Sequence, residues 1–196
     1  MKLAGKHIGL GITGSFCTYE TLYLELEKLI KEGAEVHPIF SKNAGSIDTR
    51  FGKADEFIER IETLCNRKSI MTIEDAEPIG PKNLFDILIV APCTGNTIGK
   101  LANAIIDTPV LMAAKAHLRN LKPLVIYLST NDALSMNFSN IATLYNSKNI
   151  YFVPFGQDNY LLKPNSMVSH PEFIIATIEM ALEKKQLQPV IYSYKS

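Results

Sequence analysis

The chain has 196 residues, 46% of them hydrophobic, and its 20 Lys and Arg residues are balanced by 20 Asp and Glu residues. This length suits one domain with a substantial core, and the balanced charge leaves no excess basic surface for nucleic acid or an anionic membrane. The three cysteines are odd in number, so we expect reduced thiols in a cytoplasmic protein. No N-terminal signal pattern is present, and no apolar run approaches the roughly 20 residues of a membrane span.

Short apolar runs alternate with helical patterns along the chain. Strands are predicted over residues 6–12, 35–40, 87–90, 123–128 and 150–153, and helices over 19–32, 57–64, 97–105, 110–118, 141–147 and 171–183. The stretches 67–83 and 155–169 contain Gly and Pro and are predicted to be irregular, and Pro38 places the second strand at an edge or a bulge. The alternation predicts an α/β fold: a single domain, 1–196, with a three-layer, doubly wound, mostly parallel sheet.

Two junctions between a strand and a helix carry small polar residues. Residues 91–104, Ala-Pro-Cys-Thr-Gly-Asn-Thr-Ile-Gly-Lys-Leu-Ala-Asn-Ala, follow the apolar strand 87–90, and residues 11–15 follow the first strand. In an open α/β sheet, ligands bind outside the carboxyl ends of the strands, where new helices present free backbone N–H groups. We therefore expect both junctions to line one shared site.

Residues 9–14 match G-x-G-x-x-G, the dinucleotide fingerprint. A dinucleotide site needs a carboxylate at the end of the second strand to hold the ribose, but that strand ends Ile39-Phe40-Ser41-Lys42-Asn43. Hydroxyl, cation and amide groups suit a phosphate better than a diol. NAD or NADP binding remains an alternative, as does a purely structural role for the glycines in strand–helix packing.

Together these segments resemble the flavoprotein family of homo-oligomeric flavin-containing cysteine decarboxylases. In that family the second motif is typically Pro-Ala-Ser/Thr-Ala-Asn-Thr, followed by a Lys-Leu/Ile-Ala-Asn helix, which residues 92–97 and 100–103 resemble. A looser match lies at residues 155–172, so the resemblance covers nearly the whole chain. It implies a Rossmann-like flavoprotein fold, FMN across the carboxyl ends of the strands, and assembly as a trimer or a multiple of trimers.

The resemblance also implies flavin-binding residues at four places. The junction after the first strand would contact the ribityl chain and phosphate, and the end of the second strand would reach the phosphate. The junction after the central strand would line the flavin, and the end of the next strand would close the site. In that order the residues are Thr13, Gly14 and Ser15; Ser41; Thr94, Asn96 and Thr97; and Ser129, Thr130 and Asn131.

The decarboxylase chemistry of this family does not carry over. Those enzymes use a His in the segment before the central strand, where this chain has Glu77-Pro78-Ile79-Gly80-Pro81. Their Pro-x-Met-Asn substrate loop survives only as Leu134-Ser135-Met136-Asn137, without its Pro. The four histidines lie elsewhere and have no metal-ligand spacing, so we assign no metal site and no catalytic residue.

Cys93 and Asp132 are the reactive-looking residues near the expected site. A thiol at a helix N-terminus can have a lowered pKa and be nucleophilic, although a packing role is commoner there. Asp132 is a candidate general base, and a turn or capping role is the alternative. The residues alone leave both choices open.

Three further segments, 76–82, 129–134 and 149–158, resemble one branch of this superfamily. That branch consists of oxidoreductase subunits from endospore-forming bacteria that act with a second subunit, which has its own nicotinamide-binding domain for NADP. The resemblance implies a redox subunit with non-covalent FMN. A non-catalytic assembly partner with a vestigial flavin site, and an independent flavin-dependent decarboxylase, are the alternatives.

Overall fold

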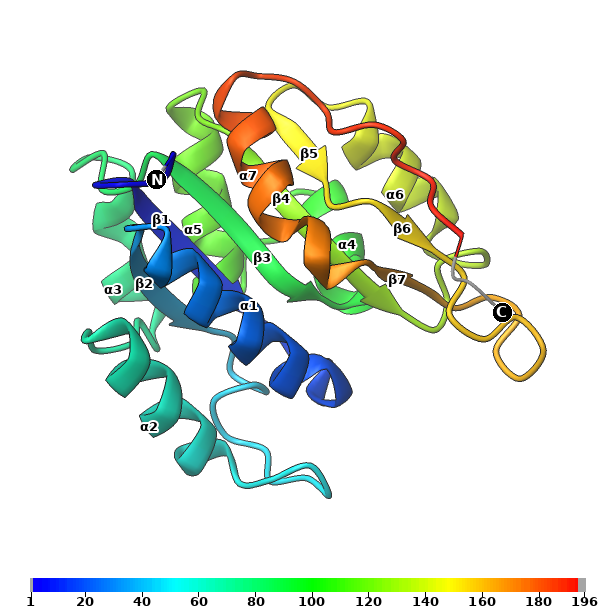
Figure 1. The fold of residues 1–196 in the computed structure, drawn as a ribbon, viewed down its shortest axis with the longest axis horizontal. Helices are drawn as coiled ribbons and strands as arrows, with labels where there is room; N and C mark the ends of the chain where they lie inside the picture. Colours follow the sequence, from blue (N-terminus) through cyan, green and yellow to red (C-terminus); the bar gives the residue numbers. More distant parts are fainter. Residues whose placement is uncertain (1, 194–196) are drawn as a thin grey trace.

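The computed structural model describes residues 2–193, and within this range seven strands form one sheet (Figure 1). The order along the sheet is β2-β1-β3-β4-β7-β6, with β5 also paired to β4. Pairing among β1 to β5 is parallel, whereas β7 is antiparallel to both β4 and β6. The strands are β1 (His7–Ile12), β2 (Glu35–Phe40), β3 (Ile87–Cys93), β4 (Leu124–Thr130), β5 (Ile150–Phe152), β6 (Phe155–Gly156) and β7 (Met167–Ser169).

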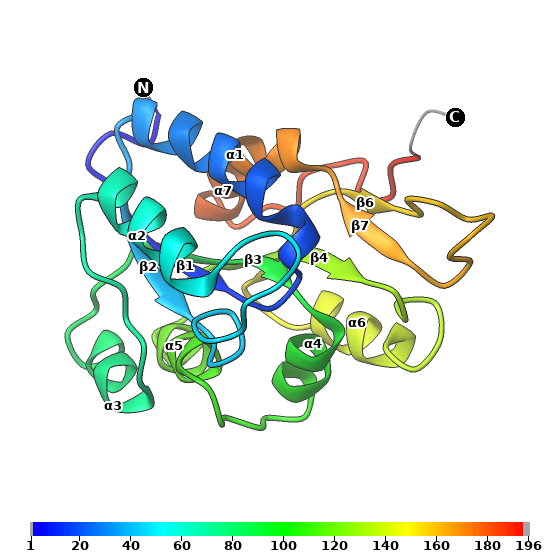
Figure 2. The ribbon, with the colours of Figure 1, turned by 90° about the horizontal axis from the view of Figure 1, so that it is seen from below.

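Helices cover both faces of the sheet, which lies in the middle of Figure 2. One face carries α1 (Tyr19–Lys31), α2 (Ala54–Cys65) and α7 (Ile174–Leu182). The other face carries α3 (Ile73–Ala76), α4 (Gly95–Ala102), α5 (Pro109–Arg119) and α6 (Phe138–Tyr145). Single 3₁₀ turns lie at Phe16–Thr18, Glu77–Ile79 and Pro171–Phe173. The predicted α/β fold with three layers is confirmed.

The central strand shows why both faces must be covered. Every residue of β3 is buried, and successive side chains point to opposite faces. Ile87 and Ile89 pack into the core beneath α1 and α7, whereas Leu88 and Val90 pack into the core against α5. A strand this apolar is stable only between two helical layers.

Pro38 lies in the edge strand β2, as the sequence predicts. The N–H of Phe40 donates outward to the Ile70 carbonyl at 3.0 Å, so the Pro38 nitrogen, two residues earlier, also faces outward. No strand within residues 2–193 pairs with β2 on that side, so the absence of an N–H on Pro38 removes no hydrogen bond between strands.

Two stretches predicted to be irregular contain regular structure. Residues 155–169 supply the short strands β6 and β7, and residues 67–83 include α3 and a 3₁₀ turn. The antiparallel pair forms because Ser129 and Thr130, at the end of β4, pair with Val168 and Met167. Strands of two and three residues are too short to give a periodic signal.

The C-terminal segment, residues 186–192, packs along the outer side of β5 and β6. The Gln186 side chain accepts a hydrogen bond from the Phe152 N–H at 2.8 Å and donates one to the Phe152 carbonyl at 2.7 Å. Further along, the Phe155 N–H donates to the Val190 carbonyl, and the Tyr192 N–H donates to the Phe155 carbonyl, both at 2.9 Å. This segment is therefore part of the sheet edge.

None of the helices within residues 2–193 combines the length and apolar character that a membrane crossing requires.

Candidate functional site

A cleft of about 560 Å³ opens where β1, β2 and β3 end. This volume lies within the range of roughly 300–1,000 Å³ that is typical of small-molecule sites. The cleft is lined by residues from both predicted junctions and from the loops that precede α5 and follow β2: Thr13, Gly14, Ser41, Lys42, Asn43, Thr94, Asn96, Thr97, Lys100, Asp107 and Thr108. The two junctions thus share one site, as the topology predicts.

Thr13 joins the ends of β1 and β3. Its hydroxyl donates to the Pro92 carbonyl at 2.7 Å and accepts a hydrogen bond from the Thr94 N–H at 3.1 Å. The Thr13 side chain is almost fully buried, and its carbonyl accepts a hydrogen bond from the Tyr19 hydroxyl at 3.0 Å. These contacts fix the two junctions relative to each other, so the buried Thr13 side chain supports the wall of the cleft.

Thr94 begins helix α4. Its hydroxyl accepts a hydrogen bond from the Thr97 N–H at 3.3 Å and lies 3.1 Å from the Thr97 hydroxyl, so Thr94 is the N-cap residue. The other N–H groups of this first turn have no partner within the helix. Asn96 is exposed at the cleft, beside those N–H groups. The arrangement favours an anionic ligand group, because a helix N-terminus carries partial positive charge.

Two lysines add charge to the cleft. Lys42 is exposed just after β2, next to the buried Ser41, whose hydroxyl accepts a hydrogen bond from the Ala44 N–H at 3.3 Å. Lys100 extends from α4 and forms an ion pair with Asp107 at 2.6 Å. Lys42, without an ion-pair partner among the described residues, is the cation available for a phosphate.

The residues predicted at the end of β4 and just after it, Ser129, Thr130 and Asn131, lie beside the cleft and do not line it. The Ser129 hydroxyl is 2.7 Å from the Ser15 hydroxyl, which links the end of β4 to the junction after β1. The Thr130 hydroxyl donates to the Asp132 carboxylate, and the Asn131 amide oxygen accepts a hydrogen bond from the Ser166 hydroxyl at 3.3 Å. Ser15 and Ser129 thus border the site as a pair, whereas Thr130 and Asn131 have partners outside the cleft.

Asp132 belongs to a polar network between α4 and α6. Its second carboxylate oxygen accepts a hydrogen bond from the Asn137 amide at 2.8 Å, and its backbone carbonyl accepts from the N–H groups of Ser135 and Asn137. A Cβ on Gly95 would lie 2.5–2.7 Å from polar atoms of Thr130, Asp132 and Asn137. Of the two roles that the sequence left open, this geometry supports the turn-forming one.

Cys93 is fully buried, and burial raises the pKa of its thiol well above the ordinary value. Burial therefore disfavours the nucleophilic thiolate, and the position of Cys93 in the hydrophobic core supports the packing role.

None of the four histidines lines the cleft. The buried His117 ring hydrogen-bonds the Pro123 carbonyl at 2.9 Å, and burial lowers its pKa to about 4. His170 is also buried, with its ring nitrogen 3.0 Å from the Tyr192 carbonyl. His7 and His37 lie at the opposite, amino-terminal end of the sheet. The geometry thus offers no imidazole for acid–base work in the cleft.

A second, less polar hollow of about 150 Å³ lies between the start of α1 and α2, bordered by Phe16, Phe57 and Arg60. We place the functional site in the larger cleft because the latter lies at the carboxyl ends of the strands and has convergent polar groups.

The sequence reasoning missed Lys100, Asp107 and Thr108 as cleft residues. Thr108 precedes Pro109 and caps α5 through a hydrogen bond from the Leu111 N–H at 3.2 Å. A Thr-Pro pair before a helical pattern is a recognisable helix start, and this signal would have placed a third helix N-terminus at the same edge of the sheet.

The fold and this cleft define a class of protein. The sequence profile of the Flavoprotein family matches residues 1–179, so the chain belongs to the Flavoprotein family. Within the family, the chain is 51% identical to the B subunit of dipicolinate synthase from Bacillus subtilis over 190 residues, which cover 97% of this chain and 95% of that protein. The resemblance to one branch of the superfamily is thereby confirmed.

Solved structures agree with this assignment. A crystal structure of the B subunit of dipicolinate synthase from Bacillus halodurans has a TM-score of 0.91 and 48% sequence identity, covering 98% of this chain and 99% of that chain. The FMN-dependent cysteine decarboxylase SpaF has a TM-score of 0.64 at 20% identity, covering 92% and 97% of the two chains. This more distant likeness shows the fold alone.

Proposed function

We propose that this chain is the B subunit of a dipicolinate synthase and that it holds FMN in the cleft. In this role it contributes, in the cytoplasm of a sporulating cell, to the oxidation of a dihydrodipicolinate-type precursor to dipicolinate. Its partner is the dipicolinate synthase A subunit, which carries NADP. The observation that carries the proposal is the shared cleft at the ends of β1, β2 and β3 in a chain 51% identical to the B subunit of a dipicolinate synthase.

The residues of the cleft fit a phosphate-bearing cofactor. The phosphate would lie near Gly14, in the junction after β1 that also carries the Ser15 hydroxyl, and near Ser41 and the exposed Lys42, which follow β2. Thr94, Asn96 and Thr97, at the start of α4, would face the flavin ring, and the Ser15–Ser129 pair would border the ribityl chain. Thr13 would hold these two junctions in register.

When bound, FMN would supply a centre that accepts and passes on an electron pair. The chain itself would bind and orient the cofactor, since neither a reactive thiol nor an imidazole lies in the cleft among the described residues. The same observation argues against an independent cysteine decarboxylase. We also propose that the chain is a single domain and that it assembles as a trimer or a multiple of trimers.

The direct test is to purify the chain alone, denature it, and assay the supernatant for FMN by absorbance and mass. We expect either one FMN per chain or stoichiometric uptake of added FMN, which quenching of the flavin fluorescence would measure. A protein that neither contains nor takes up FMN, yet is needed for activity of the A subunit, would replace this proposal with that of a non-catalytic assembly partner.

Variants separate the cleft from the rest of α4. Asn96→Ala should weaken FMN binding, because the Asn96 amide lies at the cleft. Asn103→Ala is the matched control, because Asn103 is at the other end of α4, where its amide donates to the Gly99 carbonyl at 2.8 Å. Equal FMN affinity in the two variants would contradict the placement of the flavin.

A further inference from the structure

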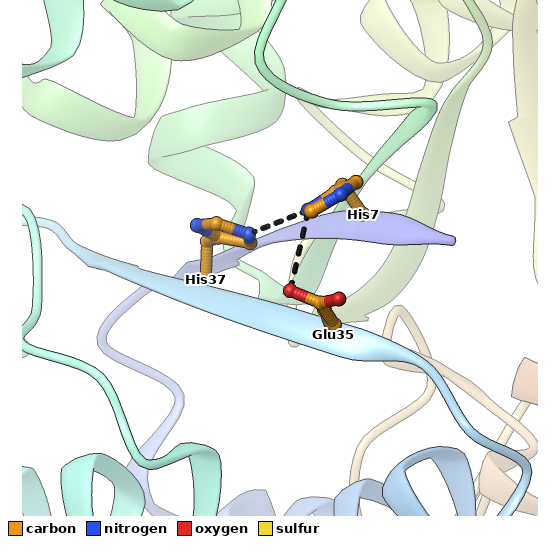
Figure 3. Close-up of side chains that lie close together, drawn as sticks. All are labelled: His7, Glu35 and His37. Atoms are coloured by element: carbon orange, nitrogen blue, oxygen red, sulfur yellow. Dashed lines mark hydrogen bonds and ion pairs between the residues drawn. The ribbon is translucent and has the colours of Figure 1, made fainter. Parts of the chain in front are cut away.

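Two imidazoles and one carboxylate, from His7, His37 and Glu35, lie close together on β1 and β2 (Figure 3). They belong to the amino-terminal half of these strands, whereas the cleft lies at the carboxyl ends. The His7 Nδ1 and His37 Nε2 atoms are 3.2 Å apart, and His7 Nδ1 is 3.6 Å from a carboxylate oxygen of Glu35. One ligand atom from each residue lies within 4.8 Å of the others. The cluster plays no part in the proposed flavin site, so an inference from it stands independently of that function.

Strand register creates the cluster. His7 and Glu35 are direct partners in the parallel pair β1–β2, so their side chains share one face of the sheet. His37 is two residues further along β2 and faces the same way. Its partner on β1 is Gly9, which has no side chain, and the His37 ring packs at 5.1 Å, between centroids, from the Phe85 ring. All three ligand atoms therefore point to one position at the sheet edge.

The distances suit a tetrahedral ion. Zinc–nitrogen bonds of about 2.0–2.1 Å place two ligand atoms of a tetrahedron about 3.3 Å apart. The two separations from His7 Nδ1, 3.2 and 3.6 Å, bracket this value. The third separation, between His37 Nε2 and the Glu35 carboxylate, is within 4.8 Å, so the Glu35 side chain, which is 46% exposed, must move closer when a tetrahedral ion binds.

We propose that His7, Glu35 and His37 form a binding site for one divalent transition-metal ion of the zinc type. Two imidazoles and one carboxylate are a ligand set of zinc sites that keep a fourth position for water. Because the site joins β1 to the edge strand β2 and lies far from the cleft, bound metal stabilises this edge and has no part in the flavin chemistry.

Arg67 competes with the metal. Its guanidinium donates to the same Glu35 oxygen that approaches His7, at 2.6 Å. Metal binding must displace this ion pair or move it to the other carboxylate oxygen. The competition gives the proposal a distinctive signature, because removal of the Arg67 charge should strengthen metal binding rather than weaken it.

The test is titration of the untagged chain with Zn²⁺ by calorimetry, with Co²⁺ as a spectroscopic probe of tetrahedral coordination. We expect one ion per chain in the wild type. His7→Gln and His37→Gln should each weaken binding at least about 10-fold, since even residues that only orient a ligand are worth 10–100-fold. Arg67→Gln should bind Zn²⁺ more tightly than the wild type and should show the same Co²⁺ spectrum.

Glu35→Gln has a matched control in Glu20→Gln, because Glu20 forms a comparable exposed ion pair with Arg60 at 2.6 Å. Zn²⁺ should raise the melting temperature of the wild type and of Glu20→Gln, but not that of Glu35→Gln. The proposal is overturned if Zn²⁺ does not bind saturably, if the histidine variants bind as tightly as the wild type, or if Arg67→Gln binds more weakly.

Discussion

Replacement of Thr13 by Val tests whether this residue holds the two junctions of the cleft together. Valine has nearly the same shape but lacks the hydroxyl that donates to the Pro92 carbonyl and accepts from the Thr94 N–H. Each buried group left without a partner costs about 1–3 kcal/mol. Because Thr94 is only partly buried and water can reach it, we expect the free energy of unfolding to fall by about 2–4 kcal/mol.

Urea denaturation at a fixed protein concentration measures this effect. With a slope of about 2 kcal/mol per molar urea, in the middle of the usual range, the midpoint should fall by about 1–2 M while the slope is unchanged. Thr13→Ser is the control, because it keeps the hydroxyl and loses only a methyl group, at about 1 kcal/mol. If Thr13→Val unfolds within about 0.5 kcal/mol of the wild type, the two hydrogen bonds do not hold the junctions, and the reasoning fails.

Burial and packing support three further predictions. Iodoacetamide at pH 8 should modify the exposed Cys17 in the native protein but should modify Cys93 only after unfolding, because burial raises the pKa of Cys93. Peptide mass mapping would show which cysteine is labelled, and rapid labelling of Cys93 in the native protein would contradict this prediction. His117 has a pKa of about 4 when folded and about 6.5 when unfolded, so the unfolded state binds more protons between these values and stability falls as pH falls through this window. At pH 5 the free energy of unfolding is lower by about 2 kcal/mol, and His117→Gln should flatten the pH dependence of the urea midpoint. An unchanged pH profile in this variant would show that His117 is not the group responsible. Gly95→Ala should destabilise the fold by about 1–3 kcal/mol, although alanine favours helix, because its Cβ would overlap Thr130, Asp132 and Asn137; a stability gain in urea denaturation would refute the packing argument.

Much of the fold can be predicted from local sequence patterns. The helix around Leu22 and Leu26 repeats its apolar residues at helical spacing, and the strand 87–90 is uniformly apolar. In both segments the local pattern is enough to predict the secondary structure and the burial. The strands β6 and β7 could not be predicted, because they exist only through pairing with the end of β4. Their residues carry no periodic signal of their own.

The residues of the candidate site also differ in how far local sequence predicts them. Thr94 and Asn96 can be placed from the motif alone, because a strand and a helix N-terminus flank them directly. The partners of Thr130 and Asn131 depend on how a loop folds back, and the sequence does not contain that geometry in local form. The histidine cluster could not be predicted for the same reason, because 30 residues separate His7 from His37 and only the register of β1 and β2 brings them together.

The strip formed by residues 186–192 determines how the chain can assemble. Gln186 uses its side-chain amide to satisfy both backbone groups of Phe152, and Val190 and Tyr192 do the same for Phe155 through their own backbone. A free sheet edge would invite another chain to add a strand. Since the chain already occupies this edge itself, neither a second copy nor a different partner can extend the sheet there unless the strip first detaches. Chains that join on this side must therefore pack through side chains, and a fusion placed after the strip would leave the edge protected.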